Sequence, residues 1–158
     1  MNVTKLNFVK GKKMSLSDRR VQYLVPAAMM SERTLSKILI VDDDEGVTQT
    51  FARMLRLEGY QVRTAVSAEK GLIEAEQSHP DAIILDLRMP LVDGLGFLRR
   101  LRAHDDHRDT PVAIVTGDYF LDDSVSTELR ELGAELRFKP LWLEDLVGLA
   151  RNLLKVTH

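Results

Sequence analysis

Charged and hydroxyl side chains stand at the ends of several short apolar runs. In chain order these residues are Asp42, Asp43, Asp86, Thr116 and Lys139. Three carboxylates brought together repel one another, which raises their pKa values and costs stability unless a cation compensates the charge. Mg²⁺ favours a few carboxylates together with water and phosphate oxygens, and a hydroxyl and an ammonium suit phosphoryl oxygens. If these side chains converge, they are suited to Mg²⁺-dependent phosphoryl chemistry.

Convergence requires the apolar runs to be neighbouring strands of one parallel sheet. The predicted strands are residues 37–41, 60–66, 82–86, 111–116 and 135–138. The predicted helices alternate with them and are residues 45–58, 68–78, 95–103, 121–132 and 143–154. Such alternation indicates parallel β-α-β units with right-handed crossovers, in a sheet covered on both faces. Ligands of open α/β sheets bind beyond the carboxyl ends of the strands, where these side chains stand.

Residues typical of helix ends support these boundaries. Asp44 and Ser67 precede the first two predicted helices, and both side chains are suited to cap a helix amino terminus. Gly59 and Gly133 follow the first and fourth predicted helices, as glycine commonly does.

Composition describes an ordinary globular chain with an uneven charge distribution. Of the 158 residues, 44% are hydrophobic and 29% are charged, and none is cysteine, which excludes a disulfide framework. Residues 1–35 carry seven Lys/Arg and two Asp/Glu, whereas residues 36–158 carry fifteen and twenty-two. We therefore predict a basic amino-terminal extension, residues 1–36, that is flexible or docked, followed by one domain, residues 37–158.

This charge and hydropathy pattern also predicts location and partners. The acidic body would repel nucleic-acid phosphates, so we expect no direct DNA binding. No apolar run is long enough to cross a bilayer, and the apolar stretch near the amino terminus is interrupted by Pro26. We expect a cytoplasmic protein without membrane contact.

Four short motifs stand in a particular order at the strand ends: "VDDDE", "LDLRMPLVDG", "VTGD" and "FKP". Together they resemble the receiver domain of bacterial two-component response regulators, over residues 37–154. The resemblance implies a flavodoxin-like (βα)5 fold, with a five-stranded doubly wound parallel sheet of order 2-1-3-4-5.

The resemblance also implies a role for each residue of the site. Asp86 would accept a phosphoryl group from a phosphohistidine. The implied Mg²⁺ ligands are Asp42, Asp43, Asp86 and the backbone carbonyl of Arg88. The residues implied to hold the phosphoryl oxygens are Thr116, Gly117 and Lys139. The protein would be a regulatory phospho-acceptor and not an enzyme, catalysing only its own phosphorylation and autodephosphorylation.

Several further residues carry structural expectations. Pro90 and Gly94 should shape the turn after Asp86 and contact nothing else. The Lys139–Pro140 peptide bond should be cis, which the resemblance implies. Three histidines near helix ends should interact with helix dipoles and not with a metal: His79, His104 and His107.

Two features bear on signalling. Receivers often carry an aromatic residue three positions before the lysine, but Leu136 stands there, so an aromatic switch is in doubt. Arg88 and Asp118 carry opposite charges and should border the entrance to Asp86, as lifetime-tuning positions of related receivers do. We hypothesise that they slow the attack of water on the phosphorylated aspartate.

The resemblance implies a sensor histidine kinase or a phosphotransfer protein as phosphodonor. A downstream protein or a second copy of the chain would bind the fourth and fifth predicted helices. The residues expected to be exposed there are Arg130, Glu131 and Arg151, and those expected to face inward are Val125, Leu129 and Leu132. The sequence is consistent with a stand-alone receiver and with a fragment of a longer protein.

Three other functions compete with this interpretation. A haloacid-dehalogenase-like Mg²⁺ phosphatase also uses an aspartate nucleophile, but it needs a second acid where Arg88 stands. A flavin carrier shares the fold, but "DDDEG" after the first strand would repel a phosphate. A degenerate receiver would bind partners without phosphorylation, and the complete set of acids, threonine and lysine argues against it.

Overall fold

The computed structural model describes residues 35–155, so the predicted extension lies outside the described residues except for positions 35 and 36. The strands are β1 (Lys37–Val41), β2 (Gln61–Ala65), β3 (Ala82–Asp86), β4 (Val112–Thr116) and β5 (Ala134–Phe138). They form one parallel sheet in the order β2-β1-β3-β4-β5, which confirms the predicted topology.

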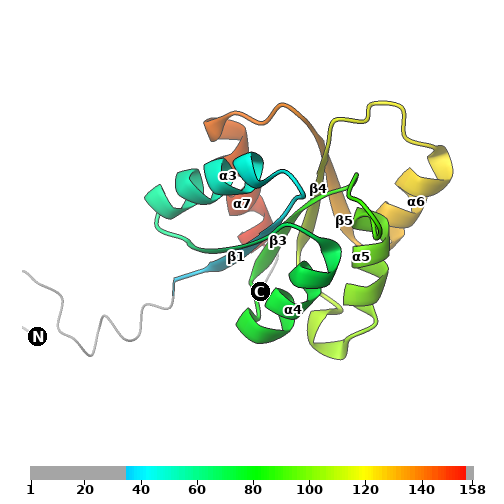
Figure 1. Ribbon diagram of the computed structural model, residues 1–158, viewed down its shortest axis with the longest axis horizontal. Helices are drawn as coiled ribbons and strands as arrows, with labels where there is room; N and C mark the ends of the chain where they lie inside the picture. The colour runs from blue at the N-terminus through cyan, green and yellow to red at the C-terminus, as the bar shows by residue number, and fades with distance from the viewer. Residues whose placement is uncertain (1–34, 156–158) are drawn as a thin grey trace, which may run out of the picture. The chain divides into compact units, whose positions relative to one another are not determined.

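Helices cover both faces of this sheet (Figure 1). They are α3 (Glu45–Leu57), α4 (Ala68–Ser78), α5 (Gly94–Arg102), α6 (Asp123–Glu131) and α7 (Leu143–Lys155), with a short 3₁₀ turn η2 (Asp105–His107). Helices α3 and α7 cover one face, and α4, α5 and α6 cover the other. Within residues 35–155, no helix combines the length and apolar character needed to cross a membrane.

The predicted helix caps are confirmed at two amino termini. The Asp44 carboxylate accepts a hydrogen bond from the Val47 N–H at 3.2 Å, and the Ser67 hydroxyl accepts one from the Lys70 N–H at 3.2 Å. Helix α6 begins at Asp123, two residues later than predicted, with Asp122 at its capping position. Gly133, beyond its carboxyl end, adopts a φ of +78°, which explains the glycine there.

An apolar core fills the space between the sheet and its helices on each of the two faces. All positions of β3 and β4 are buried, as expected of central parallel strands covered on both faces. The residues of α6 and its carboxyl-terminal cap that were predicted to face inward pack in the core, namely Val125, Leu129 and Leu132. Those predicted to be exposed are exposed, namely Arg130, Glu131 and Arg151.

His107 departs from the prediction of a dipole interaction at a helix end. Its side chain is only 3% exposed, and its ring stacks on that of His79 with centroids 5.8 Å apart. The Nδ1 atom of His107 lies 3.2 Å from the Thr110 hydroxyl. His107 is thus a buried residue that packs against the His79 ring, because the turn that carries it folds next to α5.

Candidate functional site

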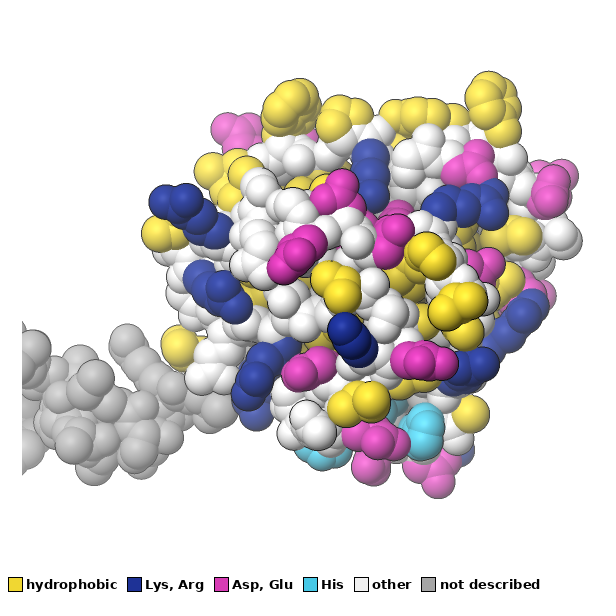
Figure 2. Space-filling model, in the orientation of Figure 1, with side chains coloured by type: hydrophobic (Ala, Val, Ile, Leu, Met, Phe, Trp, Pro, Cys, Tyr) yellow, Lys and Arg dark blue, Asp and Glu magenta, His cyan; other side chains and the backbone are white. Residues whose placement is uncertain are grey.

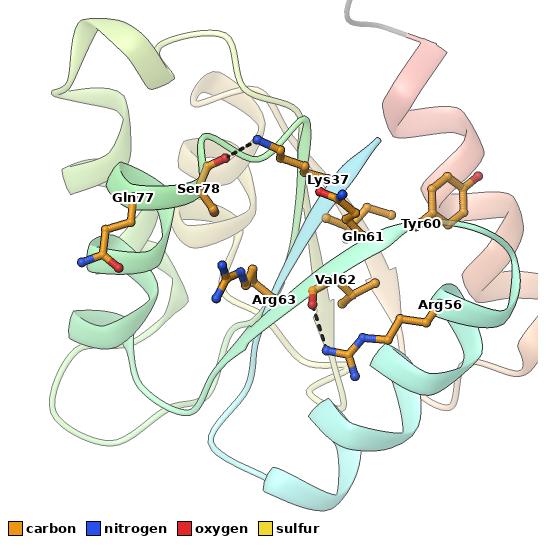
Figure 3. A pocket seen from close by; sticks show the side chains of 9 residues that line it. Lys37, Arg56, Tyr60, Gln61, Val62, Arg63, Gln77 and Ser78 are labelled. Carbon is orange, nitrogen blue, oxygen red and sulfur yellow. Dashed lines mark hydrogen bonds between the residues drawn. The ribbon is translucent and has the colours of Figure 1, made fainter. Parts of the chain in front are cut away.

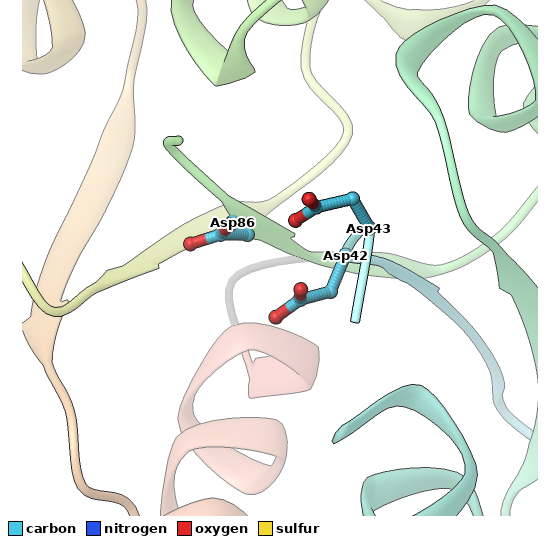
Figure 4. A group of neighbouring side chains, drawn as sticks. All are labelled: Asp42, Asp43 and Asp86. Atoms are coloured by element: carbon cyan, nitrogen blue, oxygen red, sulfur yellow. The ribbon is translucent and has the colours of Figure 1, made fainter. Parts of the chain in front are cut away.

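Three carboxylates converge at the carboxyl edge of the sheet (Figure 4). Asp42 follows β1, Asp43 comes next in the chain, and Asp86 ends β3, so adjacent parallel strands deliver them to one place. Oxygens of the three side chains lie within 4.8 Å of one another. Asp42 and Asp86 are buried, whereas Asp43 is exposed and leaves the cluster open to solvent.

Lys139 joins this cluster from the position directly after β5, the edge strand next to β4. Its ammonium donates to Asp42 Oδ2 at 3.1 Å and to Asp86 Oδ1 at 3.3 Å. The backbone N–H of Lys139 donates to the Thr116 carbonyl at 2.8 Å, which fixes the lysine against the end of β4. The structure therefore brings together the predicted acids and the predicted lysine.

The site carries an excess of negative charge in a partly dry environment. Burial raises the pKa of Asp86 above its ordinary value, the Asp42 carboxylate adds to this, and the Lys139 ammonium works against it. Burial works to lower the pKa of Lys139, but Asp42 and Asp86 outweigh it, so that pKa is raised. Three carboxylates facing one ammonium leave the cluster short of positive charge.

Thr116 and the loop after it border the cluster. Thr116 is fully buried at the end of β4, and its hydroxyl accepts a hydrogen bond from the Asp118 N–H at 3.1 Å. A Cβ atom added to Gly117 would meet nothing within 4 Å, so there is open space at this position.

Arg88 and Asp118 contact one another, as expected from their positions. Two guanidinium nitrogens of Arg88 donate to a single oxygen, Asp118 Oδ2, with Nε at 3.1 Å. The second oxygen, Oδ1, accepts from the Phe120 N–H at 3.0 Å. The hydrogen bond raises the pKa of Arg88 and lowers that of Asp118. The pair is thus formed, but not as two parallel bonds to both carboxylate oxygens.

Pro140, Gly94 and Pro90 were predicted to shape the backbone around the site. The Lys139–Pro140 bond is cis, which confirms the prediction. The prediction that Gly94 contacts nothing is wrong, because it packs against the main chain of Asp86 and Leu87. A Cβ atom there would lie 2.5 Å from the Asp86 carbonyl oxygen, so residue 94 must be glycine to let the helix start so close to β3. Pro90 is exposed in the intervening loop.

Tyr119 is a residue of this edge that the sequence did not point to. Its hydroxyl donates to the backbone carbonyl of Lys139, and its ring stacks on that of Phe138 with centroids 5.3 Å apart. Leu136 stands at the position where receivers often carry an aromatic residue, and its side chain packs against the core. No local sequence pattern predicts the contact of Tyr119 with Lys139, because the two residues lie in loops that are distant in sequence.

These carboxylates suit a hard divalent cation, because they offer several oxygens from fixed backbone positions and lack enough protein cations to balance them. The fold and the site thus define a flavodoxin-like α/β protein with a candidate Mg²⁺ site at the carboxyl edge of its sheet.

Comparisons with known proteins agree with this class. A family model for the response regulator receiver domain matches residues 38–149. The chain therefore belongs to the response regulator receiver family. Among solved structures it is similar to the chemotaxis response regulator CheY4 of Vibrio cholerae, with a TM-score of 0.71 and 28% identity, covering 77% of this chain and 100% of that one. A CheY-like receiver of Methanospirillum hungatei has the same TM-score and identity, over 78% and 97% of the two chains.

Curated relatives are longer than the matched region. The transcriptional regulatory protein PrrA of Mycobacterium tuberculosis is 39% identical over 123 residues, which is 77% of this chain and 51% of PrrA. The response regulator MprA of Mycolicibacterium vanbaalenii is 37% identical over 124 residues, again 77% of this chain and 51% of the relative. The chain thus spans about half the length of these relatives.

This comparison corrects one expectation about partners. The absence of direct DNA binding was inferred from the acidic body, but PrrA, which is 39% identical over the matched residues, is named a transcriptional regulatory protein. The prediction of no direct DNA binding is therefore wrong. Its physical error was to treat the charge of one domain as that of the whole unit of function, although half of the relative lies outside the match.

Proposed function

We propose that this receiver accepts a phosphoryl group on Asp86 from a phosphohistidine of a sensor kinase or phosphotransfer protein, with Mg²⁺ held by Asp42, Asp43 and Asp86. The observation that carries the proposal is the convergence of three carboxylates with the Lys139 ammonium at the end of β3. The likeness to PrrA supports a role in the control of transcription. The predicted ligand role of the Arg88 backbone carbonyl belongs to the same proposal.

In the proposed step, an oxygen of the Asp86 carboxylate attacks phosphorus in line with the phosphohistidine nitrogen. The new P–O bond forms as the P–N bond breaks, and the electron pair of that bond stays on the imidazole. Bound Mg²⁺ would offset the charge of the carboxylates and of the phosphoryl oxygens. In this proposal Thr116, Gly117 and Lys139 would hold the phosphoryl oxygens. The Lys139 ammonium, 3.3 Å from Asp86 Oδ1, supports its part in this role.

The test is phosphorylation by acetyl phosphate, measured as a mass increase of the intact protein. Wild type should gain one phosphoryl group in Mg²⁺ buffer and none in EDTA, and Asp86→Asn should gain none in either. Asp81→Asn is a matched control, because Asp81 is an exposed aspartate at the other end of β3.

The same experiment separates the proposal from its alternative. A degenerate receiver that binds partners without phosphorylation would gain no phosphoryl group although it still binds Mg²⁺. Labelling of Asp86→Asn at the wild-type level would place the acceptor elsewhere and contradict the proposal.

A further inference from the structure

A cavity of about 580 Å³ lies at the amino-terminal ends of β1 and β2 (Figure 3). Because β1 runs from Lys37 to Val41 and Asp42 follows it, the cavity and the acidic cluster lie at opposite ends of that strand. The cavity is therefore separate from the site already described.

Cationic side chains from three elements line the cavity. Lys37 comes from β1, Arg56 from α3 and Arg63 from β2. Among residues 35–155, no aspartate or glutamate lines the cavity. Residues 36–158 carry twenty-two acidic residues against fifteen basic ones, so a cavity with three cations and no acid differs sharply from its surroundings. Cations gathered in this way repel one another unless an anion compensates them.

Most of the hydrogen-bond donors in these cations have no protein acceptor. Arg63 is exposed, and its guanidinium forms no hydrogen bond or ion pair with any residue among 35–155. Arg56 donates to the Val62 carbonyl at 2.9 Å, and the Lys37 ammonium donates to the Ser78 carbonyl at 3.3 Å. A guanidinium has five N–H donors and an ammonium has three, so these bonds leave most donors available.

The nearby acid does not neutralise the cavity. Asp81 accepts a hydrogen bond from the backbone N–H of Lys37 at 2.8 Å, and it does not line the cavity. The remaining polar groups of the lining are uncharged and include the phenol of Tyr60 and the amide of Gln61. The cavity thus offers positive charge together with neutral hydrogen-bonding groups.

We propose that this cavity binds a small phosphate-bearing anion with at least two negative charges. Guanidinium groups match phosphate oxygens in two parallel hydrogen bonds, and the ammonium adds a point charge. The volume falls within the range of small-ligand sites, which is about 300–1,000 Å³. Arg63 contributes most to affinity, because it has no protein partner to give up on binding. This site is independent of phosphoryl transfer to Asp86.

The test is an NMR titration of the full chain with inorganic pyrophosphate, without Mg²⁺ and at constant ionic strength. Backbone amides of Lys37, Arg56 and residues 61–63 should shift along a saturating curve. Arg63→Gln should weaken binding about tenfold, since one charge-assisted interaction is lost. Arg53→Gln removes the same charge from an exposed position of α3 outside the cavity, and should change the affinity less than about twofold.

Three outcomes would overturn the proposal. The first is that these amides show no saturable shift. The second is equal weakening in the two variants, which would mean a general response to net charge. The third is that the shifts concentrate around Asp86 and Lys139, which would place the anion at the acidic edge. Because the Arg63 guanidinium has no hydrogen-bond or ion-pair partner among residues 35–155, its variant should fold, and the dispersion of its spectrum checks this.

Discussion

Gly94 packs so closely on Asp86 that a Cβ atom at residue 94 would lie 2.5 Å from the Asp86 carbonyl oxygen. The Gly94 N–H also donates to the Leu87 carbonyl at 2.8 Å, so the residue cannot move away without losing this bond. We expect Gly94→Ala to lower the free energy of unfolding by about 1–3 kcal/mol, the usual cost of overpacking. Urea denaturation measures this, and the displaced end of β3 should also slow phosphorylation of Asp86.

Gly148→Ala is the matched control for this substitution. Gly148 lies inside α7, and an added Cβ there would meet nothing within 4 Å. Alanine is favoured over glycine in helix interiors by about 0.5–1 kcal/mol, so this variant should be more stable than wild type. If both variants lose stability, the close contact of Gly94 with Asp86 is not the cause of the loss in Gly94→Ala.

Mg²⁺ should stabilise the folded protein by relieving repulsion among its clustered carboxylates. If it binds only the folded state, the gain reaches about 2.7 kcal/mol at a concentration of 100 Kd. Asp43→Asn should reduce this gain, because it removes one carboxylate of the cluster at an exposed position. Thermal unfolding with increasing MgCl₂ provides the measurement.

Asp44→Asn serves as the control for that experiment. The substitution removes a neighbouring charge but keeps an oxygen able to cap α3, and Asp44 is outside the cluster. Its response to Mg²⁺ should equal that of wild type. An equal reduction in both variants would indicate a general charge effect and not a specific site.

Arg88 and Asp118 should prolong the lifetime of phosphorylated Asp86 by obstructing the approach of water. We expect Arg88→Ala and Asp118→Ala to lose phosphate faster than wild type, by a few-fold only, because exposed ion pairs contribute little. The measurement is the decay of the phosphorylated protein in Mg²⁺ buffer after removal of acetyl phosphate. Arg99→Ala breaks a comparable exposed pair with Glu128 and should leave the decay unchanged. Unaltered decay in both site variants would remove the obstruction hypothesis.

Stability should fall as the pH drops below about 6.5, because His107 titrates at a lower pH in the folded protein than in the unfolded chain. Burial, and then the nearby His79, lower the pKa of His107 below its ordinary value. The unfolded chain therefore takes up this proton at a higher pH than the folded protein, so the contribution is complete above about pH 6.5 and is lost as the pH falls through the folded pKa. The charged groups around the ring include Asp106, which raises the pKa, and His104, which lowers it.

The urea midpoints of wild type and of His107→Phe should be compared at pH values above and below about 6.5. The variant lacks the titrating group, so its midpoint should change less with pH, whatever its absolute stability. The raised pKa of Asp86 has the opposite effect, because protonation of Asp86 makes the folded protein more stable as the pH falls. Asp86 is present in both proteins, so it does not contribute to the difference between them. Parallel pH profiles would show that His107 is not the responsible group.

The sequence predicted the topology and the acidic cluster because both follow from short-range patterns. Apolar runs such as "AIILD" and "VAIVT" alternate with helical periods, which implies a parallel sheet with its carboxyl ends on one edge. Asp42, Asp86 and Lys139 stand at those ends, so their convergence could be expected before any contact was known. The caps at Asp44 and Ser67 are equally local, since each side chain bonds an N–H three residues on.

Only the tertiary structure decided the contacts between segments that are distant in the chain. The approach of Gly94 to Asp86 depends on how closely α5 begins beside β3, and the Tyr119 bond to Lys139 depends on where two loops lie. The basic cavity likewise brings together Lys37, Arg56 and Arg63 from three elements, and these residues follow no periodic pattern in the sequence. Hydrophobic periodicity and capping determine which segments form and which edge they share, because they act over a few residues. The packing between elements sets the remaining distances, since it depends on the shapes of all the side chains between them.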